Sequence, residues 1–543
     1  MNKLSEVKTS HPAPKCIPCA NVQPKQDIIC KKSGKHMCSA CRLVSYCSKD
    51  CQKAHWYRHK LDCQNPMRSE DWQPSWIKTG RIPSFMTENE WGNTPATDMV
   101  NHAYNEKDAN KDFALAFIAS GDLRHVLRSL NELPPDYSGK LNILLNDINI
   151  PIVCRNIVLL LVLGNVSDPA EAADIALHFW YSLFMPSEYR MQITCILNTF
   201  LCEYIASDGS PTRLGPHSTF SLCITGGLNE FFQHYISSSF SIQDAQDEYN
   251  RVRNAPSRLD YRDRMYAGLK PSHRVAFERY RRFGILLPFG AMNAHFNCPN
   301  NSLFSLEGKW WQTDYADPLE GWDIAAIITV GKRYGATAED IYGCLYFFLS
   351  EQLRIFIRRL RTTATTFTAF CMDACDIPKH IQNGLFSDLN FPASSRFDRI
   401  VVSNIFDVNY VGIEGVLRPW SPLLAETKNA AIVGYFMNWF LFQKDGLDLS
   451  VMMFLSMADA DALYENSRSF SKFLQTQGIS GILQKTKLRL REKHRIVPQR
   501  ILAPLQGPTN ALPEFPDDDT WYHYTKLTCF SWAERFVEFE RAN

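Results

Sequence analysis

Residues Cys16 to Cys63 read CIPCANVQPKQDIICKKSGKHMCSACRLVSYCSKDCQKAHWYRHKLDC, and this stretch decides the fold of the first part of the chain. It holds eight of the 17 cysteines, whereas the other nine are scattered over the remaining 480 residues of the 543. Clustered cysteines separated by two residues indicate metal ligands, since a two-residue gap lets the chain turn around one ion. Scattered cysteines are more often small apolar core residues.

Two such pairs, Cys16-x2-Cys19 and Cys38-x2-Cys41, each offer two thiolates to a tetrahedral zinc ion. The remaining half-sites are pairs with gaps of three residues, which place both ligands on one face of a helical turn. The eight predicted ligands are Cys16, Cys19, Cys38, Cys41, Cys47, Cys51, His59 and Cys63. They make two closed four-ligand sites, which leave no position for an activated water and therefore predict two structural Zn2+ ions.

The same stretch, with its ending YCSKDCQKAHWYRHKLDC, resembles the MYND zinc finger over residues 16–63. The resemblance implies that the ligands of the two ions alternate along the chain. One zinc would be bound by Cys16, Cys19, Cys47 and Cys51, and the other by Cys38, Cys41, His59 and Cys63. The 18-residue stretch between Cys19 and Cys38 is longer than the family usually has, and it carries Cys30 and His36. Replacement of a first-pair cysteine by Cys30 or His36 is therefore the alternative for the first site, because a structural zinc takes four ligands.

MYND fingers bind short proline-rich peptides in a shallow groove, and the resemblance places that groove at Ser39, Gln52 and Trp56. An indole face can stack on a proline ring while the glutamine amide bonds the extended peptide backbone. The alternative is that Trp56 packs on its own finger, as aromatic residues of small modules often do. The resemblance thus predicts protein partners.

The overall composition excludes some other partners. Lys and Arg number 58 against 57 Asp and Glu, so the net charge of +1 offers no long-range field for nucleic acid or an anionic membrane. The longest apolar stretches, Ile157–Leu163 and Ala430–Phe442, are shorter than the ~20 residues of a membrane-crossing helix and indicate buried core. The first 15 residues lack the apolar run of a secretory signal, which predicts a protein of the cytoplasm, or also of the nucleus.

Residues 64–90, rich in Pro and Trp, indicate a linker, and an α/β texture begins at Trp91. Phe113–Ala119 predicts a strand, the Ser120-Gly121-Asp122 turn follows, an amphipathic helix comes next, and Leu141–Leu145 predicts a second strand ending near Asp147. In such a unit the first turn faces a ligand crevice, and an acidic residue after the second strand can bond a ribose hydroxyl.

This unit resembles the opening of the methyltransferase-like domain of unknown function that fungal MYND proteins share with dynein axonemal assembly factors. The quoted cues, which span residues 91–290, are WGNTP from Trp91, SGDLRH from Ser120, LND from Leu145 and LLPFG from Leu286. The resemblance implies a Rossmann-like α/β fold. Use of S-adenosylmethionine through Gly121 and Asp147 is the alternative function, although the turn has one glycine where the dinucleotide fingerprint has several.

The predicted architecture is a cross-braced zinc finger at 16–63, a linker at 64–90 and a methyltransferase-like α/β domain. The domain's first part spans 91–300, a helical insertion spans 301–395, and the remaining strands with a closing helix span 396–543. Phe397–Ser403 and Ala430–Phe436 are the predicted later strands, a helix is expected between them, and Ser531–Arg541 is the predicted closing helix. The chain contains no HExxH, GxSxG or complete phosphate-loop motif. We therefore expect an adaptor with a catalytically degenerate body, not an enzyme.

Overall fold

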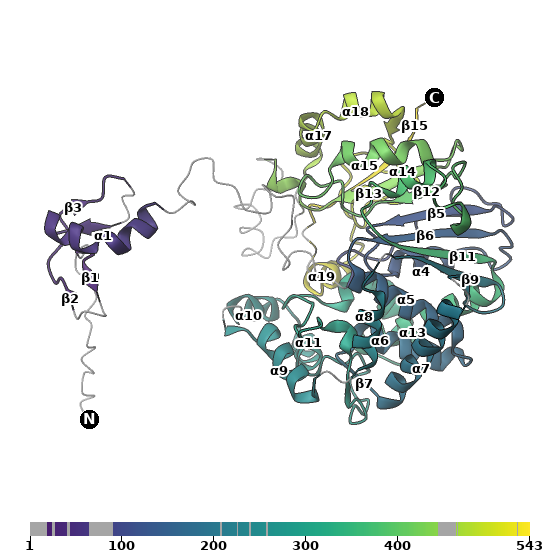
Figure 1. The fold of residues 1–543 in the computed structure, drawn as a ribbon, viewed down its shortest axis with the longest axis horizontal. Coiled ribbons are helices and arrows are strands. Elements are labelled where there is room, and N and C mark those ends of the chain that lie inside the picture. The colour runs from purple at the N-terminus through teal and green to yellow at the C-terminus, as the bar shows by residue number, and fades with distance from the viewer. Residues whose placement is uncertain are drawn as a thin grey trace. The chain divides into compact units, whose positions relative to one another are not determined.

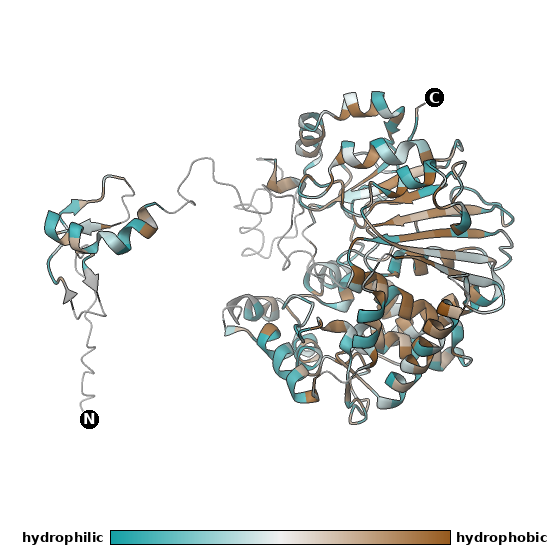
Figure 2. Ribbon diagram, in the orientation of Figure 1, coloured by the Kyte–Doolittle hydropathy of each residue, from teal (hydrophilic) through white to brown (hydrophobic). Residues whose placement is uncertain are grey.

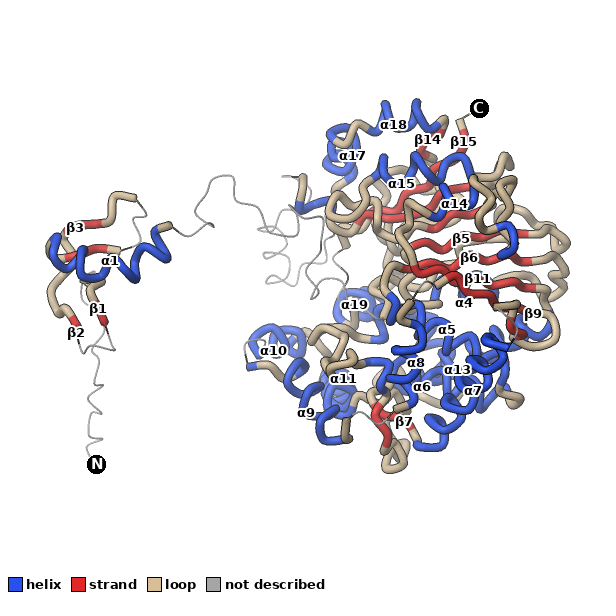
Figure 3. The backbone as a smooth tube through the Cα atoms, viewed as in Figure 1, coloured by secondary structure: helices blue, strands red, loops and turns tan. Residues whose placement is uncertain are grey.

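A computed structural model describes residues 19–23, 28–40, 44–64, 91–206, 209–224, 226–237, 240–256, 259–443, 463, 465–528, 530 and 532–542. The chain divides into two compact units, residues 1–81 and 82–543 (Figures 1 and 3). The predicted linker at 64–90 lies outside the described residues except for Gln64.

The first unit is built from two short hairpins and one helix. Strands β1 (Val22–Gln23) and β2 (Ile28–Ile29) pair antiparallel, as do β3 (His36–Met37) and β4 (Ser45–Tyr46). Helix α1 spans Lys49–Cys63. Among the described residues of this unit, the buried side chains are Cys19, Asn21, Cys38, Ser45, Tyr46, His59 and Cys63. Apolar burial by these residues offers little to offset the chain entropy of the unit.

A nine-stranded mixed sheet organises the second unit, in the order β14-β15-β13-β12-β5-β6-β11-β9-β8. The six strands from β13 to β9 run parallel, whereas β15 is antiparallel to both neighbours and β8 is antiparallel to β9. Their bounds are β5 Phe113–Ile118, β6 Leu141–Asp147, β8 Thr212–Arg213, β9 Ser218–Cys223, β11 Thr365–Cys371, β12 Arg399–Val401, β13 Ala431–Phe436, β14 Leu488–Leu490 and β15 Arg535–Arg541. A separate pair joins β7 (Phe184–Met185) to β10 (Cys298–Pro299).

The sheet is buried on both faces, and the alternation of side chains along β5 shows how. Leu115 and Phe117 enter one apolar core, whereas Ala116 and Ile118 enter the other. Successive residues of a strand point to opposite faces, so a continuous apolar run such as FALAFI suits a strand covered on both sides. The apolar residues accordingly concentrate on the strands and the helices that cover them (Figure 2).

Helices cover both faces of this sheet. On the first face, with Leu115, the core includes residues of α4 (Arg124–Asn131), α5 (Ile150–Asn165), α6 (Pro169–Tyr181), α12 (Ile324–Arg333) and α13 (Ile341–Thr362). On the second face the core includes α14 (Ile377–Gln382), α15 (Ile413–Trp420), α17 (Ser467–Thr476) and α18 (Ile479–Thr486). The remaining helices are α7 Ser187–Ala206, α8 Leu228–Ile236, α9 Ile242–Arg253, α10 Leu259–Ala267, α11 Pro271–Phe283 and α19 Asp518–Lys526. Among the described helices, none combines the length and apolar character needed to cross a bilayer.

The predicted strands and the helix after the first turn are present as β5, α4, β6, β12 and β13, and α15 lies between the last two. Two boundaries differ from the prediction. The helices that follow β6 begin with α5, well before residue 301, and the last of them, α13, is followed by strand β11. The segment 301–395 is therefore not a purely helical insertion. The closing element is strand β15, not a helix.

The reason for the second error is visible in the sequence of β15. Phe536 and Phe539 are three residues apart, a spacing that fits one face of a helix. In the structure the segment pairs with β13 and β14, with Phe536 in one apolar core and Val537 and Phe539 in the other. Apolar runs this short do not distinguish a helix from a strand that is buried on both faces.

Candidate metal centre

Four cysteines of the first unit gather around one point. The sulfur atoms of Cys19, Cys30, Cys47 and Cys51 all lie within 4.8 Å of one another. The sulfur of Cys47 is 3.6 Å from that of Cys30 and 3.5 Å from that of Cys51. The backbone N–H of Cys47 also donates a hydrogen bond to the Cys19 sulfur over 3.3 Å.

The β1–β2 hairpin explains how Cys30 reaches this group. Cys19 and Cys30 lie on either side of the hairpin, and the Cys30 N–H donates to the carbonyl oxygen of Asn21 over 3.0 Å. The long stretch after Cys19 therefore turns back on itself and returns Cys30 to the first site. His36, the other spare residue, is exposed on β3 and belongs to neither ligand group of the described residues.

A second group consists of Cys38, His59 and Cys63, whose ligand atoms also lie within 4.8 Å of one another. All three residues are buried, and the two sulfur atoms are 3.8 Å apart. His59 and Cys63 are four residues apart on α1, so both side chains project from the same helical face. The predicted fourth ligand, Cys41, and the predicted first-site ligand Cys16 both lie outside the described residues.

Both groups fit zinc. A Zn–S bond of ~2.3 Å in tetrahedral geometry separates two ligand sulfurs by about 3.8 Å, close to the three S···S distances above. Thiolate and imidazole are the donors that zinc prefers in structural sites. When bound, the ion supplies folding free energy and no open coordination position. Cys19, Cys30, Cys47 and Cys51 would hold the first ion, with Cys38, His59 and Cys63 contributing to the second.

The first site's thiols already differ in acidity. A hydrogen bond with Cys51 raises the pKa of Cys47 to about 12, whereas a hydrogen bond with Asn21 lowers the pKa of Cys51 to about 7. The Cys51 thiol therefore loses its proton at a lower pH than the Cys47 thiol. Zinc must displace those protons, which makes metal affinity depend on pH.

Helix α1 links the two groups. Cys51 in its first turn belongs to the first group, whereas His59 and Cys63 near its end belong to the second. The order of ligands along the chain is therefore interleaved, with Cys38 of the second group lying between Cys30 and Cys47 of the first. Neither site can form without ordering the segment that also carries the other.

The predicted peptide-binding residues occupy two places on the finger. Gln52 and Trp56 are four residues apart on α1, so they share a helical face, and Ser39 lies in the turn after β3. Trp56 is 41% exposed, and its ring meets that of His59 edge to face at a centroid distance of 5.8 Å. The indole therefore packs partly on its own finger and still presents a face to solvent.

In the body, the structure joins the two residues of the predicted cofactor site to each other. Asp147, buried at the end of β6, accepts a hydrogen bond from the Gly121 N–H over 3.0 Å. The Gly121 carbonyl oxygen accepts another from the Asn156 side chain over 2.7 Å. Burial raises the pKa of Asp147 above its ordinary value, although the Asn149 and Gly121 N–H groups oppose that shift.

This arrangement leaves little room for a ligand. The cavity lined by Ser120, Asn146 and Asp147 has a volume of about 10 Å³. A bound small molecule needs ~300–1,000 Å³, whereas one water needs only ~10–15 Å³. The turn is thus held by its own neighbours, with its N–H and its carbonyl both bonded to protein side chains.

Comparison with known proteins gives the finger a family. Residues 28–63 match the MYND finger family. They form a MYND finger. The MYND match begins after Cys19 and includes Cys30, and the two ligand groups of the structure lie within or next to it. Residues 90–185 match a domain of unknown function, DUF4470, which includes β5, α4 and β6.

The similar curated proteins share only the finger region. The chain is 41% identical over 46 residues to N-lysine methyltransferase SMYD2-B of Danio rerio and to the protein of that name of Xenopus laevis, which is 8% of this chain and 11% of each relative. It is 59% identical over 27 residues to SET domain and MYND-type zinc finger protein 6 of Schizosaccharomyces pombe, 5% of this chain and 6% of that relative. The chain thus matches about a tenth or less of the length of these relatives, and no solved structure matches it.

Proposed function

We propose that the chain is a zinc-dependent adaptor whose MYND finger captures a proline-rich segment of a partner protein. The observation that carries this proposal is the pair of interleaved ligand groups, with the exposed Trp56 ring packed edge to face on the ligand His59. Trp56 and Gln52 share one face of α1, whereas Tyr57, one position further along the helix, is also exposed but lies on a different face. An exposed indole beside a side-chain amide is suited to binding a proline-rich peptide.

Binding at Trp56 is tested with the full-length protein on a synthetic array of proline-rich decapeptides. Trp56→Ala is compared with Tyr57→Ala, which removes a similarly exposed aromatic one position further along α1. We expect Trp56→Ala to weaken capture about tenfold or more, as loss of an aromatic anchor commonly does. Tyr57→Ala should retain most of the binding, and both variants should retain two zinc ions. Equal binding by wild type and Trp56→Ala would refute the groove.

For the body, we propose a methyltransferase-like, Rossmann-like domain without catalytic function. Leaving aside β9, which follows β6 in the chain and pairs with β11 on the side away from β6, strands β5, β6, β11, β12 and β13 have the spatial order 3-2-1-4-5 of doubly wound nucleotide-binding sheets. This order supports the likeness to the methyltransferase-like domain of dynein axonemal assembly factors. The bonded Gly121 turn and the small cavity beside Asp147 support the loss of cofactor binding.

The alternative function is a divergent S-adenosylmethionine-dependent methyltransferase. Its support is the contact between Gly121 and Asp147 at the carboxyl ends of β5 and β6, where doubly wound sheets bind their ligands. The relatives named as methyltransferases add nothing to it, since their similarity ends with the finger. Calorimetric titration of the full chain with S-adenosylmethionine separates the two functions: micromolar binding that Asp147→Ala abolishes would establish the methyltransferase.

A further inference from the structure

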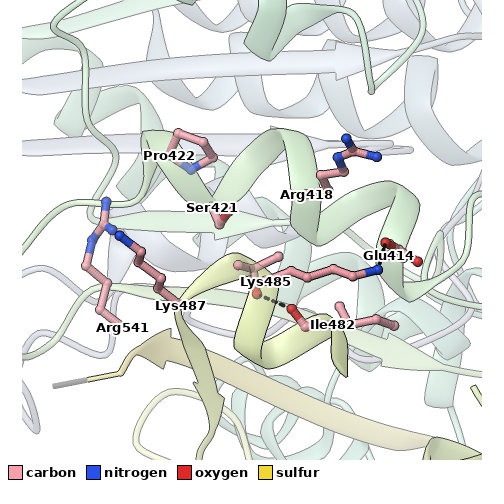
Figure 4. Close-up of a pocket in the computed structure, with 9 residues that line it drawn as sticks. Glu414, Arg418, Ser421, Pro422, Ile482, Lys485, Lys487 and Arg541 are labelled. Carbon is pink, nitrogen blue, oxygen red and sulfur yellow. Dashed lines mark hydrogen bonds and ion pairs between the residues drawn. The ribbon is translucent and has the colours of Figure 1, made fainter. Parts of the chain in front are cut away.

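Two adjoining hollows on the body, far along the chain from the cofactor turn, are lined by more Lys and Arg than Glu side chains. The first has a volume of about 550 Å³ and collects side chains from four elements: Arg418 of α15, Lys485 of α18, Lys487 before β14, and Arg541 of β15 (Figure 4). The second has a volume of about 1140 Å³ and shares Arg541 with the first. We call the two hollows together the basic groove.

Much of the positive charge in the basic groove has no acidic partner among the described residues, although Arg495 donates to the Asn429 side chain and Arg541 to the Leu424 carbonyl oxygen. Lys485 is paired with Glu414 at 3.2 Å, and Arg489 and Arg491 are paired with Glu540. Six further lining cations have no acidic side chain within ion-pair distance among the described residues: Arg418, Lys428, Lys487, Lys493, Arg495 and Arg541. In a chain whose net charge is only +1, this concentration makes the groove a local attractor of negative charge.

The groove follows an edge of the sheet. From Lys485 to Arg495 every second residue is basic, in the sequence KTKLRLREKHR, and β14 lies in the middle of this run. Among the described strands, β14 is the last on its side of the sheet and pairs with β15 alone. Arg489 is opposite Glu540, and the Arg491 N–H donates to Glu538, so the backbone groups of Leu488 and Leu490 face away from β15.

These features favour an extended polypeptide as the occupant. A free strand edge can form a hydrogen-bonded ladder with another peptide backbone, and cations at alternate positions match carboxylates at alternate positions. Neither hollow is lined by an aromatic side chain on which a base could stack, as single-stranded nucleic acids require. The carboxylates of Glu414, Glu426 and Glu492 at the same surface would also repel a uniformly charged phosphate backbone.

We propose that the basic groove binds an acidic, extended segment of a partner protein, which adds as a strand beside β14. This site is separate from the finger, so the chain would hold two partner segments through two different chemistries. It goes beyond the proposed adaptor function, because loss of the finger's peptide binding leaves the groove unchanged.

The test uses the full-length zinc-loaded protein and fluorescence anisotropy of a labelled decapeptide in which Glu and Val alternate. The variant Arg418→Gln/Lys487→Gln/Lys493→Gln removes three exposed, unpaired cations and leaves the finger unchanged. We expect it to bind the peptide about tenfold more weakly at low salt, a difference equivalent to ~1.4 kcal/mol. The matched control Lys140→Gln/Arg213→Gln/Arg282→Gln removes three exposed cations elsewhere on the body and should bind like the wild type.

Two further probes fix the kind of ligand. The corresponding Gln–Val peptide should bind at least tenfold more weakly than the Glu–Val peptide, and N-methylation at alternate residues, which prevents strand pairing, should also weaken binding. Equal affinity of the groove variant and the wild type overturns the site, and equal affinity of the N-methylated peptide overturns the added strand. Tighter binding of a 20-nucleotide RNA that depends on the same three cations overturns the choice of a polypeptide.

Discussion

Replacing Cys30 by serine is the sharpest test of the metal centre, because the structure and the family pattern differ at this residue. The sulfur of Cys30 lies 3.6 Å from that of Cys47, within the first ligand group. A structural zinc site contributes ~10–16 kcal/mol, so one of four ligands accounts for about 3 kcal/mol. At ~1.4 kcal/mol for each factor of ten, Cys30→Ser should weaken zinc binding at the first site about 100-fold.

Native mass spectrometry of the full chain counts the bound zinc ions, and competition with a chromophoric chelator measures the affinity of the weaker one. The matched control is Cys16→Ser, which removes the cysteine that the family spacing favours. We expect this variant to keep two zinc ions with unchanged affinity, since four sulfurs already complete the first group without it. His36→Ala should also leave both ions in place.

The assignment of Cys30 would be refuted if Cys16→Ser lost the first zinc while Cys30→Ser bound both ions with normal affinity. The pair Cys16 and Cys19 would then be the source of two ligands for the first site. Retention of both ions by each single variant would also contradict the assignment. In that case the two cysteines would substitute for each other, whereas the assignment makes Cys30 a ligand that the first site requires.

Three further predictions concern the body. Titration with S-adenosylmethionine should give no binding heat, and micromolar binding that is lost in Asp147→Ala would contradict the closed turn. Burial raises the pKa of Asp407 to about 7 from its ordinary 3.8, so the folded chain holds a proton that the unfolded chain releases as pH rises between these values. Asp407→Asn should therefore gain stability relative to the wild type between pH 5 and 7, by at most ~1.4 kcal/mol per pH unit in urea unfolding; a pH-independent difference would contradict this. A Cβ at Gly434 would lie 2.7 Å from the Phe406 ring, so Gly434→Ala should cost ~1–3 kcal/mol. Gly481→Ala, in open space on α18, should instead raise the melting temperature slightly; similar melting shifts in both variants would show that packing at Gly434 is not the cause.

The finger could be predicted from the sequence because the paired metal ligands lie only a few residues apart in the chain. Ligand spacings of two and three residues predict pairs of ligands, and the MYND resemblance implies the grouping of Cys19 with Cys47 and Cys51, whose sulfurs lie together. The return of Cys30 depends on the β1–β2 hairpin, whose strands are two residues long and give no periodic pattern. That residue was visible as a spare ligand, but the choice between Cys16 and Cys30 needed the fold.

The body shows a similar division. Strands with continuous apolar runs, such as β5 and β13, are evident in the sequence. Strand β11, which reads TTFTAFC, has too many threonines to form such a run, and its place in the sheet comes from pairing with β6 and β9. Spatial order within a sheet is a long-range property, and no local period encodes it. The alternating cations around β14 were present in the sequence, but only the edge position of that strand gives them a shared surface.

The two units differ in what stabilises them, and this difference bears on how an adaptor could be regulated. Among its described residues the finger buries mainly cysteine and histidine ligands, so we expect its folding, and with it the Trp56 surface, to depend on zinc. The body instead has two large apolar cores on the faces of its sheet. Under the two proposals above, removal of zinc should therefore abolish peptide capture by the finger and leave binding at the basic groove unchanged, so that a single chain releases one partner while it holds the other.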